Sequence, residues 1–307
     1  MLEPVMFTGG VYKHDLVMEL VEDLGGYILQ KNVTQSEVIL LLLIPSEDMP
    51  ALQSLAKELR GELMRAPLAG TEVVVVTPTL ATHHLPHTAC DIAEYLRRNG
   101  AKSNMIGLAR GVGREIAQIN EYETALINEH DAAVFIFGNF AECIRKKESL
   151  YRNISVPVVV TGGPEIPKED IPYAFEYVPT VGRIAHRARK ATEIGSLDRI
   201  IAAVGRALDK TRADISKDPP TTSPPRVMDA VREQVPEVEY SYSPLPIALD
   251  LTGVRIKLPY EQFKERVRAV KFDEGVTLGE IAAVRPSRMK EYILVRILPA
   301  SETGFVF

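Results

Sequence analysis

The apolar positions of the first segment, about residues 1–70, alternate between helical and extended spacing. Steps of three and four residues over 16–24 predict a helix, which the glycine pair that follows ends. Residues 27–33 and 37–44 predict strands, and the second is so continuously apolar that both of its faces should be covered. A second helix is predicted over 46–60. This order, closed by a final strand, predicts a small α+β unit.

The middle segment, about residues 71–213, repeats a short apolar run followed by polar residues and a helical pattern. This alternation predicts an α/β domain, with a parallel sheet and helices on both of its faces. The predicted strands are 73–76, 103–108, 132–137 and 156–160. In such a sheet the loops after the strands meet at the carboxyl edge, where ligands usually bind. We therefore expect that edge to carry the loops 77–90, 109–118, 138–139 and 161–164.

The last segment begins with a proline-rich stretch. Residues 217–226 contain four prolines and follow a predicted helix over 181–214, so they predict a semi-rigid linker. Strand patterns at 247–251 and 292–297 flank a predicted helix at 260–270, which indicates a third small unit. The predicted division is an N-terminal α+β domain (1–70), a central α/β domain (71–214), a linker (215–226) and a C-terminal α+β domain (227–307).

Charge and composition exclude several classes of protein. The net charge of −5 gives no general attraction to nucleic acid. The longest apolar run, 38–45, is far shorter than the roughly 20 residues that span a bilayer, so we expect a cytoplasmic protein without a membrane partner. With only Cys90 and Cys143 in the chain, a structural disulfide is not expected.

The densest group of ligand-type side chains lies after the first strand of the predicted parallel sheet. His83, His84, His87 and Cys90 place three of the six histidines and one of the two cysteines within eight residues. A helix predicted from about Asp91 would put Cys90 near its N-terminus, where backbone N–H groups favour thiolate. Such a thiolate is a nucleophile or a soft-metal ligand, and a nearby imidazole is a second ligand or orients the site.

A plainer interpretation stays open beside this one. Cysteine at a helix start is often a small buried hydrophobe, and loop histidines are often solvated. The spacing matches no standard zinc pattern, and no second cysteine is close. An open site, completed by another subunit or by a bound cluster, therefore fits better than a closed four-ligand zinc site.

Two further stretches follow predicted strands. Arg110, Gly111 and Gly113 lie in a loop that could bring backbone amides and guanidinium groups to an anion, or could be a simple turn. The loop lacks the ending of a P-loop, so nucleotide binding is not expected. Cys143 is predicted on a helix, buried as a packing residue.

These stretches carry a resemblance to a known family. About residues 72–195 resemble operon protein C of methyl-coenzyme M reductase, and the whole length resembles methanogenesis marker protein 7. The first resemblance rests on His84-Leu-Pro-His-Thr-Ala-Cys90 and Val134-Phe-Ile-Phe-Gly-Asn139. The second adds Glu3-Pro-Val, Gly9-Gly-Val-Tyr-Lys-His14, Asn104-Met-Ile-Gly-Leu-Ala-Arg-Gly-Val-Gly113, Arg285-Pro-Ser-Arg and Ile297-Leu-Pro-Ala-Ser-Glu-Thr-Gly304.

The resemblance implies an archaeal, non-catalytic subunit of the ATP-dependent complex that activates methyl-coenzyme M reductase in methanogenesis. In that complex, electrons would reach the nickel cofactor through complex iron–sulfur clusters. The implied partners are the reductase, operon protein C, an ATP-binding-cassette ATPase component and other methanogenesis marker proteins. Operon protein C also places a histidine six residues before a cysteine, which maps onto His84 and Cys90 as metal ligands. We expect His87, Arg110, Gly111 and Gly113 to line the same cofactor site, because their loops are predicted at the same edge of the sheet.

Two other classes of function remain as alternatives. Cys90 and a histidine could form the nucleophile–base pair of a small-molecule enzyme, although the sequence identifies no oxyanion donors and no acidic partner for the histidine. A cofactor-free assembly adaptor would make the histidine and cysteine loop incidental. We name no catalytic residue. A chain with two cysteines cannot supply the four thiolates of a simple cluster, so a cluster would be shared with a partner subunit.

Overall fold

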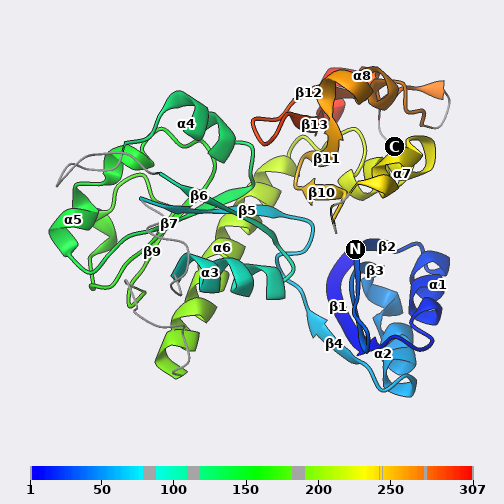
Figure 1. Cartoon of the computed structure of the whole chain (residues 1–307), viewed down its shortest axis with the longest axis horizontal. Helices are drawn as coiled ribbons and strands as arrows, with labels where there is room; N and C mark the ends of the chain where they lie inside the picture. Colours follow the sequence, from blue (N-terminus) through cyan, green and yellow to red (C-terminus); the bar gives the residue numbers. More distant parts are fainter. Residues whose placement is uncertain are drawn as a thin grey trace.

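The computed structural model describes residues 2–78, 88–108, 118–181, 191–241, 243, 245–272 and 275–305. The described residues form a five-stranded parallel sheet and two four-stranded antiparallel sheets, which confirms the predicted α/β class (Figure 1). Short 3-10 helices join some of the elements, at Ser46–Asp48, Glu148–Leu150, Lys168–Asp170 and Pro236–Tyr240.

The N-terminal sheet has the strand order β2-β3-β1-β4, with every pair antiparallel. Sequence analysis missed its first strand, whose Pro4 and terminal glycines weaken the extended pattern. The continuously apolar β3 is covered on both faces as expected, because alternate side chains enter two different cores. The elements of this unit are β1 (Leu2–Gly10), α1 (Asp15–Asp23), β2 (Tyr27–Val33), β3 (Glu37–Pro45), α2 (Met49–Glu58) and β4 (Glu62–Arg65).

The parallel sheet has the order β6-β5-β7-β8-β9. Helices α3 and α6 pack on one face, and α4 and α5 on the other. The predicted strands are all present, and sequence analysis missed only the short β9. The elements are β5 (Glu72–Thr77), α3 (Thr88–Arg98), β6 (Lys102–Gly107), α4 (Glu121–Ile127), β7 (Ala132–Ile136), α5 (Ala141–Arg145), β8 (Val158–Thr161), β9 (Glu176–Val178) and α6 (Ala191–Ile215).

The C-terminal sheet has the order β10-β11-β13-β12, again with antiparallel pairs. The two strands and the helix predicted here are present, and β11, β12 and three helices are additions. The elements are α7 (Pro224–Gln234), β10 (Ile247–Asp250), β11 (Gly253–Pro259), α8 (Tyr260–Arg268), α9 (Leu278–Ile281), β12 (Ala282–Pro286), β13 (Tyr292–Ile297) and α10 (Ala300–Thr303).

The stretch predicted as a linker is part of the folded structure. Thr221 and Thr222 are buried, and the Thr221 N–H donates to the carbonyl of Leu298 at 2.9 Å. Residues 224–226 form the first turn of α7, where proline costs little because the first N–H groups of a helix have no intrahelical partner. The stretch does not continue α6, which ends at Ile215, but its last residues begin a new helix.

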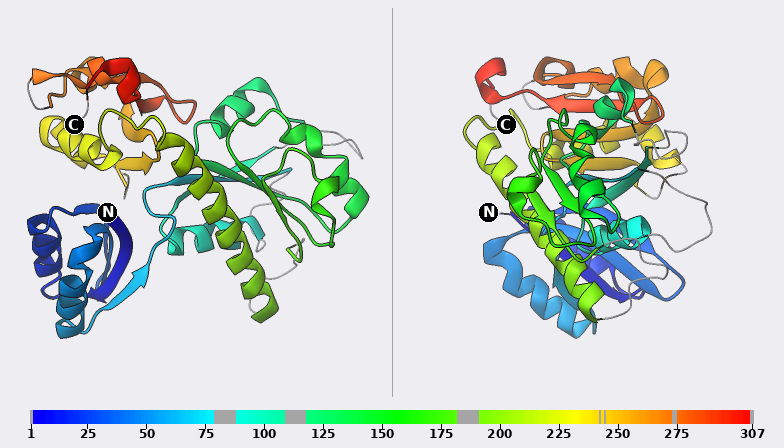
Figure 2. Two further views of the ribbon diagram at one scale, coloured as in Figure 1. Left: turned by 180° about the vertical axis from the view of Figure 1, so that it is seen from behind. Right: turned by 90° about the vertical axis from the view of Figure 1, so that its left-hand side faces the viewer.

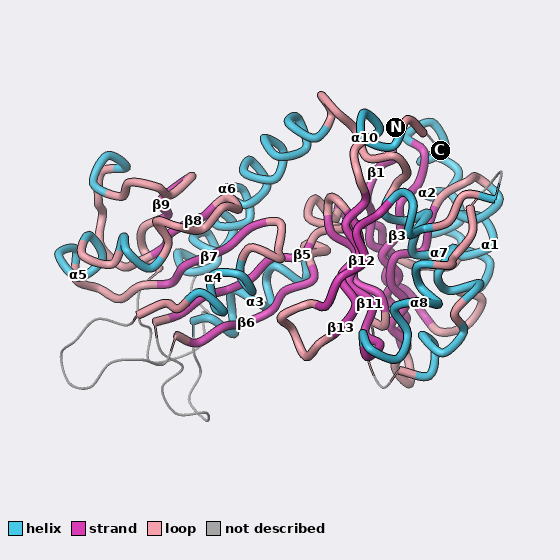
Figure 3. Tube along the Cα trace, turned by 90° about the horizontal axis from the view of Figure 1, so that it is seen from above, coloured by secondary structure: helices cyan, strands magenta, loops and turns pink. Residues whose placement is uncertain are grey.

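The N-terminal and C-terminal units pack against each other, beside the parallel sheet (Figure 2). Leu29 and Leu41 of the N-terminal sheet share one core with α7 and β10–β13. The Arg232 guanidinium on α7 also donates to the carbonyl of Ile28 at 3.3 Å. The amino ends of the parallel strands face the C-terminal sheet, so their carboxyl ends point away from both small units (Figure 3).

Candidate functional site

The carboxyl edge of the parallel sheet contains a change of winding direction. From β5 the chain crosses by α3 to β6 on one side, and from β6 it crosses by α4 to β7 on the other side of β5. Because α3, the helix after β5, and α5, the helix after β7, cover opposite faces of the sheet, the chain leaves these two neighbouring strands towards opposite sides. Ligands of doubly wound sheets bind in the crevice that such a divergence leaves.

Cys90 lies at this edge, in the first turn of α3, and its residue is exposed. The helix begins at Thr88, three residues earlier than predicted. Ala89, Ile92 and Ala93 form its buried face, and Cys90 lies outside that face. The prediction that Cys90 occupies a helix start at the carboxyl edge is confirmed, and its thiol is open to a ligand.

The other predicted site residues lie outside the described residues; they are His83, His84, His87, Arg110, Gly111 and Gly113. The structure does place the strands that precede them. β5 and β6 are parallel neighbours, and Thr77 at the end of one is the register partner of Gly107 at the end of the other. The two predicted loops therefore start from adjacent points of one edge.

Hydrogen bonds connect the described loops of this edge to one another. The N–H of Gly163 donates to the carbonyl of Gly138 at 3.1 Å, and the N–H of Thr180 donates to the carbonyl of Gly163 at 3.2 Å. A Cβ on Gly163 would lie 3.2 Å from Cα of Asn139, so glycine at this position favours the close approach of the two loops. These hydrogen bonds hold the loops after β7, β8 and β9 together.

Cys143 corrects the sequence-based prediction. It lies on α5, the helix that follows β7, but its residue is exposed, whereas the next residue, Ile144, is fully buried. The pattern of α5 therefore puts Ile144 into the core and the cysteine outside, so Cys143 is not a packing residue. Each described cysteine thus lies on the helix after one of two neighbouring strands, β5 and β7.

Sequence analysis missed a buried ionic cluster at the opposite, amino edge of the sheet. The Arg255 side chain on β11 is fully buried and donates from Nε to Glu72 Oε2 at 2.9 Å. A second of its nitrogens, Nη1, donates to Glu129 Oε2 at 2.8 Å. Ser287 Oγ also donates to Glu129, at 2.7 Å. Over 253–258, Arg255 and Lys257 alternate with apolar residues, a pattern typical of a strand with one solvated face, so no local signal marked Arg255 as buried.

The same cluster fixes the protonation of its members. Burial raises the pKa of the Glu72 carboxyl, but Arg255 and hydrogen bonds hold that pKa below its ordinary value. Burial lowers the pKa of His130, so the imidazole is neutral. Its Nδ1 lies 3.0 Å from the carbonyl of Leu126, and its Nε2 lies 3.0 Å from Asn104 Nδ2, so we assign Nδ1 as donor and Nε2 as acceptor.

A buried carboxyl group joins the parallel sheet to the C-terminal sheet beside this cluster. Asp131 accepts hydrogen bonds from the N–H of Glu72 at 2.8 Å and of Leu251 at 3.0 Å. Burial and the nearby Asp250 raise the pKa of Asp131 well above its ordinary value. Glu72, Glu129 and Arg255 are engaged with one another at the interface between units, whereas His130 and Asp131 also line the cleft at the amino edge of the sheet.

The described residues contain neither a cluster of metal-ligating side chains nor a membrane-spanning helix, but they do line a polar cleft. No group of three or more His, Cys, Asp or Glu side chains among them could hold a metal ion. No described helix is long and apolar enough to cross a membrane. A polar cleft of about 770 Å³ lies at the amino edge, between α6, the starts of β7–β9 and the turn after β10.

Solved structures resemble the chain only distantly. A formyltetrahydrofolate deformylase from Pseudomonas putida matches 66% of this chain and 55% of its own, with 11% identity and a TM-score of 0.23. A phospho-2-dehydro-3-deoxyheptonate aldolase from Thermotoga maritima matches 58% of this chain and 69% of its own, with 10% identity and a TM-score of 0.19. Neither score indicates a common overall fold.

Sequence relatives give a much clearer result. An uncharacterized protein of Methanocaldococcus jannaschii is 48% identical over 305 residues, which cover 99% of this chain and 96% of that protein. The family model described as methyl-coenzyme M reductase operon protein C matches residues 2–270. The resemblance that sequence analysis confined to about 72–195 thus extends through the N-terminal unit and into the C-terminal one. The chain belongs to the methyl-coenzyme M reductase operon protein C family.

Proposed function

We propose that this chain is a non-catalytic subunit of the complex that activates methyl-coenzyme M reductase, and that it helps to hold a complex iron–sulfur cluster. Membership in the operon protein C family links it to the operon of that reductase. Within the family, we propose that the chain is of the methanogenesis marker protein 7 type. Its partners would be the reductase, operon protein C and an ATP-binding-cassette ATPase component.

The observation that carries the proposal is the position of Cys90. Its residue is exposed in the first turn of α3, at the carboxyl edge of the sheet. Cysteine sulfur is the usual protein ligand of cluster iron, and an exposed cysteine can reach it. A single ligand at Cys90 suits a cluster that this chain holds at few points, with His84 or a residue of a partner subunit at another point. Bound there, the cluster would supply low-potential electron transfer to the nickel cofactor.

Anaerobic co-purification with metal analysis tests both parts of the proposal. The tagged full-length chain, expressed in a methanogen, should bring down the reductase and its companion subunits together with iron and sulfide. Cys90→Ala should lose most of the iron and keep its partners, because it removes one thiolate–iron bond. Cys143→Ala is a matched control for removing an exposed helical thiol. Circular dichroism must show that each variant remains folded.

Three results would contradict the proposal in different ways. A chain that runs alone in extracts is not a subunit of the complex. A folded Cys90→Ala protein with full iron and an unchanged spectrum would rule out Cys90 as a ligand. A chain that binds its partners without iron would favour the cofactor-free adaptor.

A further inference from the structure

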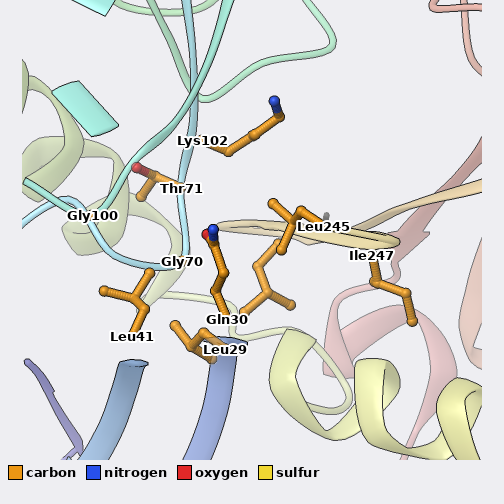
Figure 4. Close-up of a pocket in the computed structure, with 10 residues that line it drawn as sticks. Leu29, Gln30, Leu41, Gly70, Thr71, Gly100, Lys102, Leu245 and Ile247 are labelled. Atoms are coloured by element: carbon orange, nitrogen blue, oxygen red, sulfur yellow. The ribbon is translucent and has the colours of Figure 1, made fainter. Parts of the chain in front are cut away.

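The polar cleft at the amino edge of the parallel sheet has room for a small molecule. Its volume of about 770 Å³ is typical of a ligand pocket. The last turns of α6, which crosses the sheet and ends beside the C-terminal unit, form one wall of the cleft (Figure 2). The cavity where the three units meet measures only about 20 Å³, little more than the space of one water molecule (Figure 4). Of these two spaces, the cleft is the one that can hold an organic ligand.

An ion pair one turn away fixes the position of Lys210 on this wall. Arg206 on α6 binds Glu176, the first residue of β9, and its Nη2 lies 2.6 Å from Glu176 Oε1. From Arg206, α6 continues towards the amino edge, so Lys210 lies beside the segment that precedes β9. Tyr173 belongs to that segment and also lines the cleft. The cleft thus combines a cationic group with an aromatic ring.

Tyr173 lines the cleft with a strained backbone. Its φ is +64°, a value that bulky residues rarely adopt, and the residue is 61% exposed. The guanidinium carbon of Arg152 lies 5.8 Å from the centre of the tyrosine ring, within the range of a cation–π contact. Strained residues cluster at functional sites. An exposed ring held in this way offers a flat apolar surface to a ligand.

Two hydrogen-bond donors of the cleft have no partner among the described residues. The ammonium group of Lys210, an exposed residue, forms no ion pair with them. Asn128 Oδ1 accepts from the N–H of Ser155 at 2.9 Å, which leaves the Nδ2 group of Asn128 to donate elsewhere. Both groups suit a ligand that accepts hydrogen bonds.

The acidic groups of the cleft are already engaged. Asp214 pairs with Lys217 at 2.6 Å, and Arg296 pairs with Asp250. Asp131 accepts two backbone N–H groups, and burial beside Asp250 raises its pKa well above the ordinary value, so its carboxyl group is neutral. Among the described residues that line the cleft, the lysine of α6 is left without a counter-ion. The cleft therefore attracts an anion rather than a cation.

Apolar side chains form another part of the wall. Ile154 and Val156 are partly buried against the core on one face of the sheet, and Leu251 is partly buried against the core on the other face. Their exposed parts would lose contact with water against an apolar ligand, which favours binding. A ligand that matches the cleft thus has an apolar body as well as an anionic group.

We propose that this cleft binds a small organic acid, whose carboxylate pairs with Lys210 and whose apolar body lies against Tyr173 and Ile154. The carboxylate supplies the counter-ion that Lys210 lacks, and the Asn128 amide is a second donor within the cleft. The site is at the opposite edge of the sheet from Cys90, and it does not depend on the function proposed above.

Calorimetric titration of the full-length protein with benzoate, at constant ionic strength, tests this site. Benzoate should bind saturably. Benzamide, which has the ring without the charge, and acetate, which has the charge without the ring, should each bind at least about fivefold more weakly. Lys210→Gln should weaken benzoate binding by about fivefold or more, because it removes the counter-ion. Arg206→Gln makes the same change of charge one turn away on α6, so it is the matched control and should bind as the unaltered protein does.

A second variant tests the location without changing the charge. The Ser155 side chain is exposed, and the hydrogen bond to Asn128 comes from the backbone N–H of Ser155. Ser155→Trp should therefore fold, fill part of the cleft and abolish benzoate binding, and circular dichroism checks the fold.

The proposal is overturned if benzoate does not bind saturably, if benzamide binds as tightly as benzoate, or if Lys210→Gln binds benzoate as tightly as Arg206→Gln does. A folded Ser155→Trp protein with unchanged benzoate binding would also overturn it.

Discussion

At the scale of single residues, we expect the buried Arg255 side chain to matter strongly for the free energy of unfolding, because it is a fully buried charge. Its guanidinium binds two carboxylates that come from β5 and from the turn before β7. Removing one member of such a buried cluster leaves the other charges buried without a counter-ion. The resulting loss of unfolding free energy is far larger than the net stabilisation that the intact cluster provides. The residue therefore determines whether the C-terminal sheet stays against the parallel sheet.

Replacement of Arg255 by methionine should lower the free energy of unfolding by about 3–5 kcal/mol, because Glu72 and Glu129 would stay buried without their counter-ion. Chemical denaturation measures this loss. Arg206→Met, which breaks an exposed ion pair with Glu176, should cost no more than about 1 kcal/mol. A loss as small as that for Arg255→Met would show that the cluster is not buried in solution.

Lys257 should make the free energy of unfolding increase with pH above pH 8. Its pKa is about 8 in the folded chain and close to 10.5 when unfolded, so between these values only the unfolded chain keeps the proton. Stability should therefore rise from pH 8 to pH 10, by about 1–2 kcal/mol once solvent screening of this half-buried group is included.

Denaturant titrations across this pH range should show the rise in the unaltered protein and not in Lys257→Met. Lys102, Lys290, Arg255 and Glu72 are the charged groups that act on Lys257. An unchanged slope in Lys257→Met would assign the effect to another group.

At the scale of elements, helix starts explain both the successes and the failures of sequence analysis. The helix starting at Thr88 could be placed, because apolar residues recur at helical spacing after Cys90. The helix starting at Pro224 was missed, because proline is a helix breaker everywhere except in the first turn. Exposure of Cys143 could not be predicted, since one residue's shift along a five-residue helix separates a core position from a surface position.

The capping box of α4 allows a direct test at this scale. Asn120 Oδ1 accepts from the N–H of Glu123 at 2.7 Å, and the Glu123 carboxylate accepts from the N–H of Asn120 at 2.9 Å. Asn120→Ala should cost about 1 kcal/mol of unfolding free energy, since the helix loses its cap. Asn120→Asp keeps an acceptor and should lose little. Equal losses in the two variants would show that the cap contributes nothing.

At the scale of the whole molecule, the sequence predicted the class of fold and the edge that carries Cys90, but not how the units meet. Alternating strands and helices determine a parallel sheet locally. The joint between Arg255 and Glu72 connects residues 183 positions apart, and no local pattern encodes such a pairing.

The core that the N-terminal and C-terminal units share has a consequence for synthesis on the ribosome. The outer face of the N-terminal sheet, with Leu29 and Leu41, is covered by α7 and the strands after it. When residues 1–70 leave the ribosome, more than 150 residues must still be made before α7 begins at Pro224. During that interval the face is open to water, and exposed apolar sheet surface is what chaperones bind and what aggregates. The growing chain therefore depends on protection until its last third emerges.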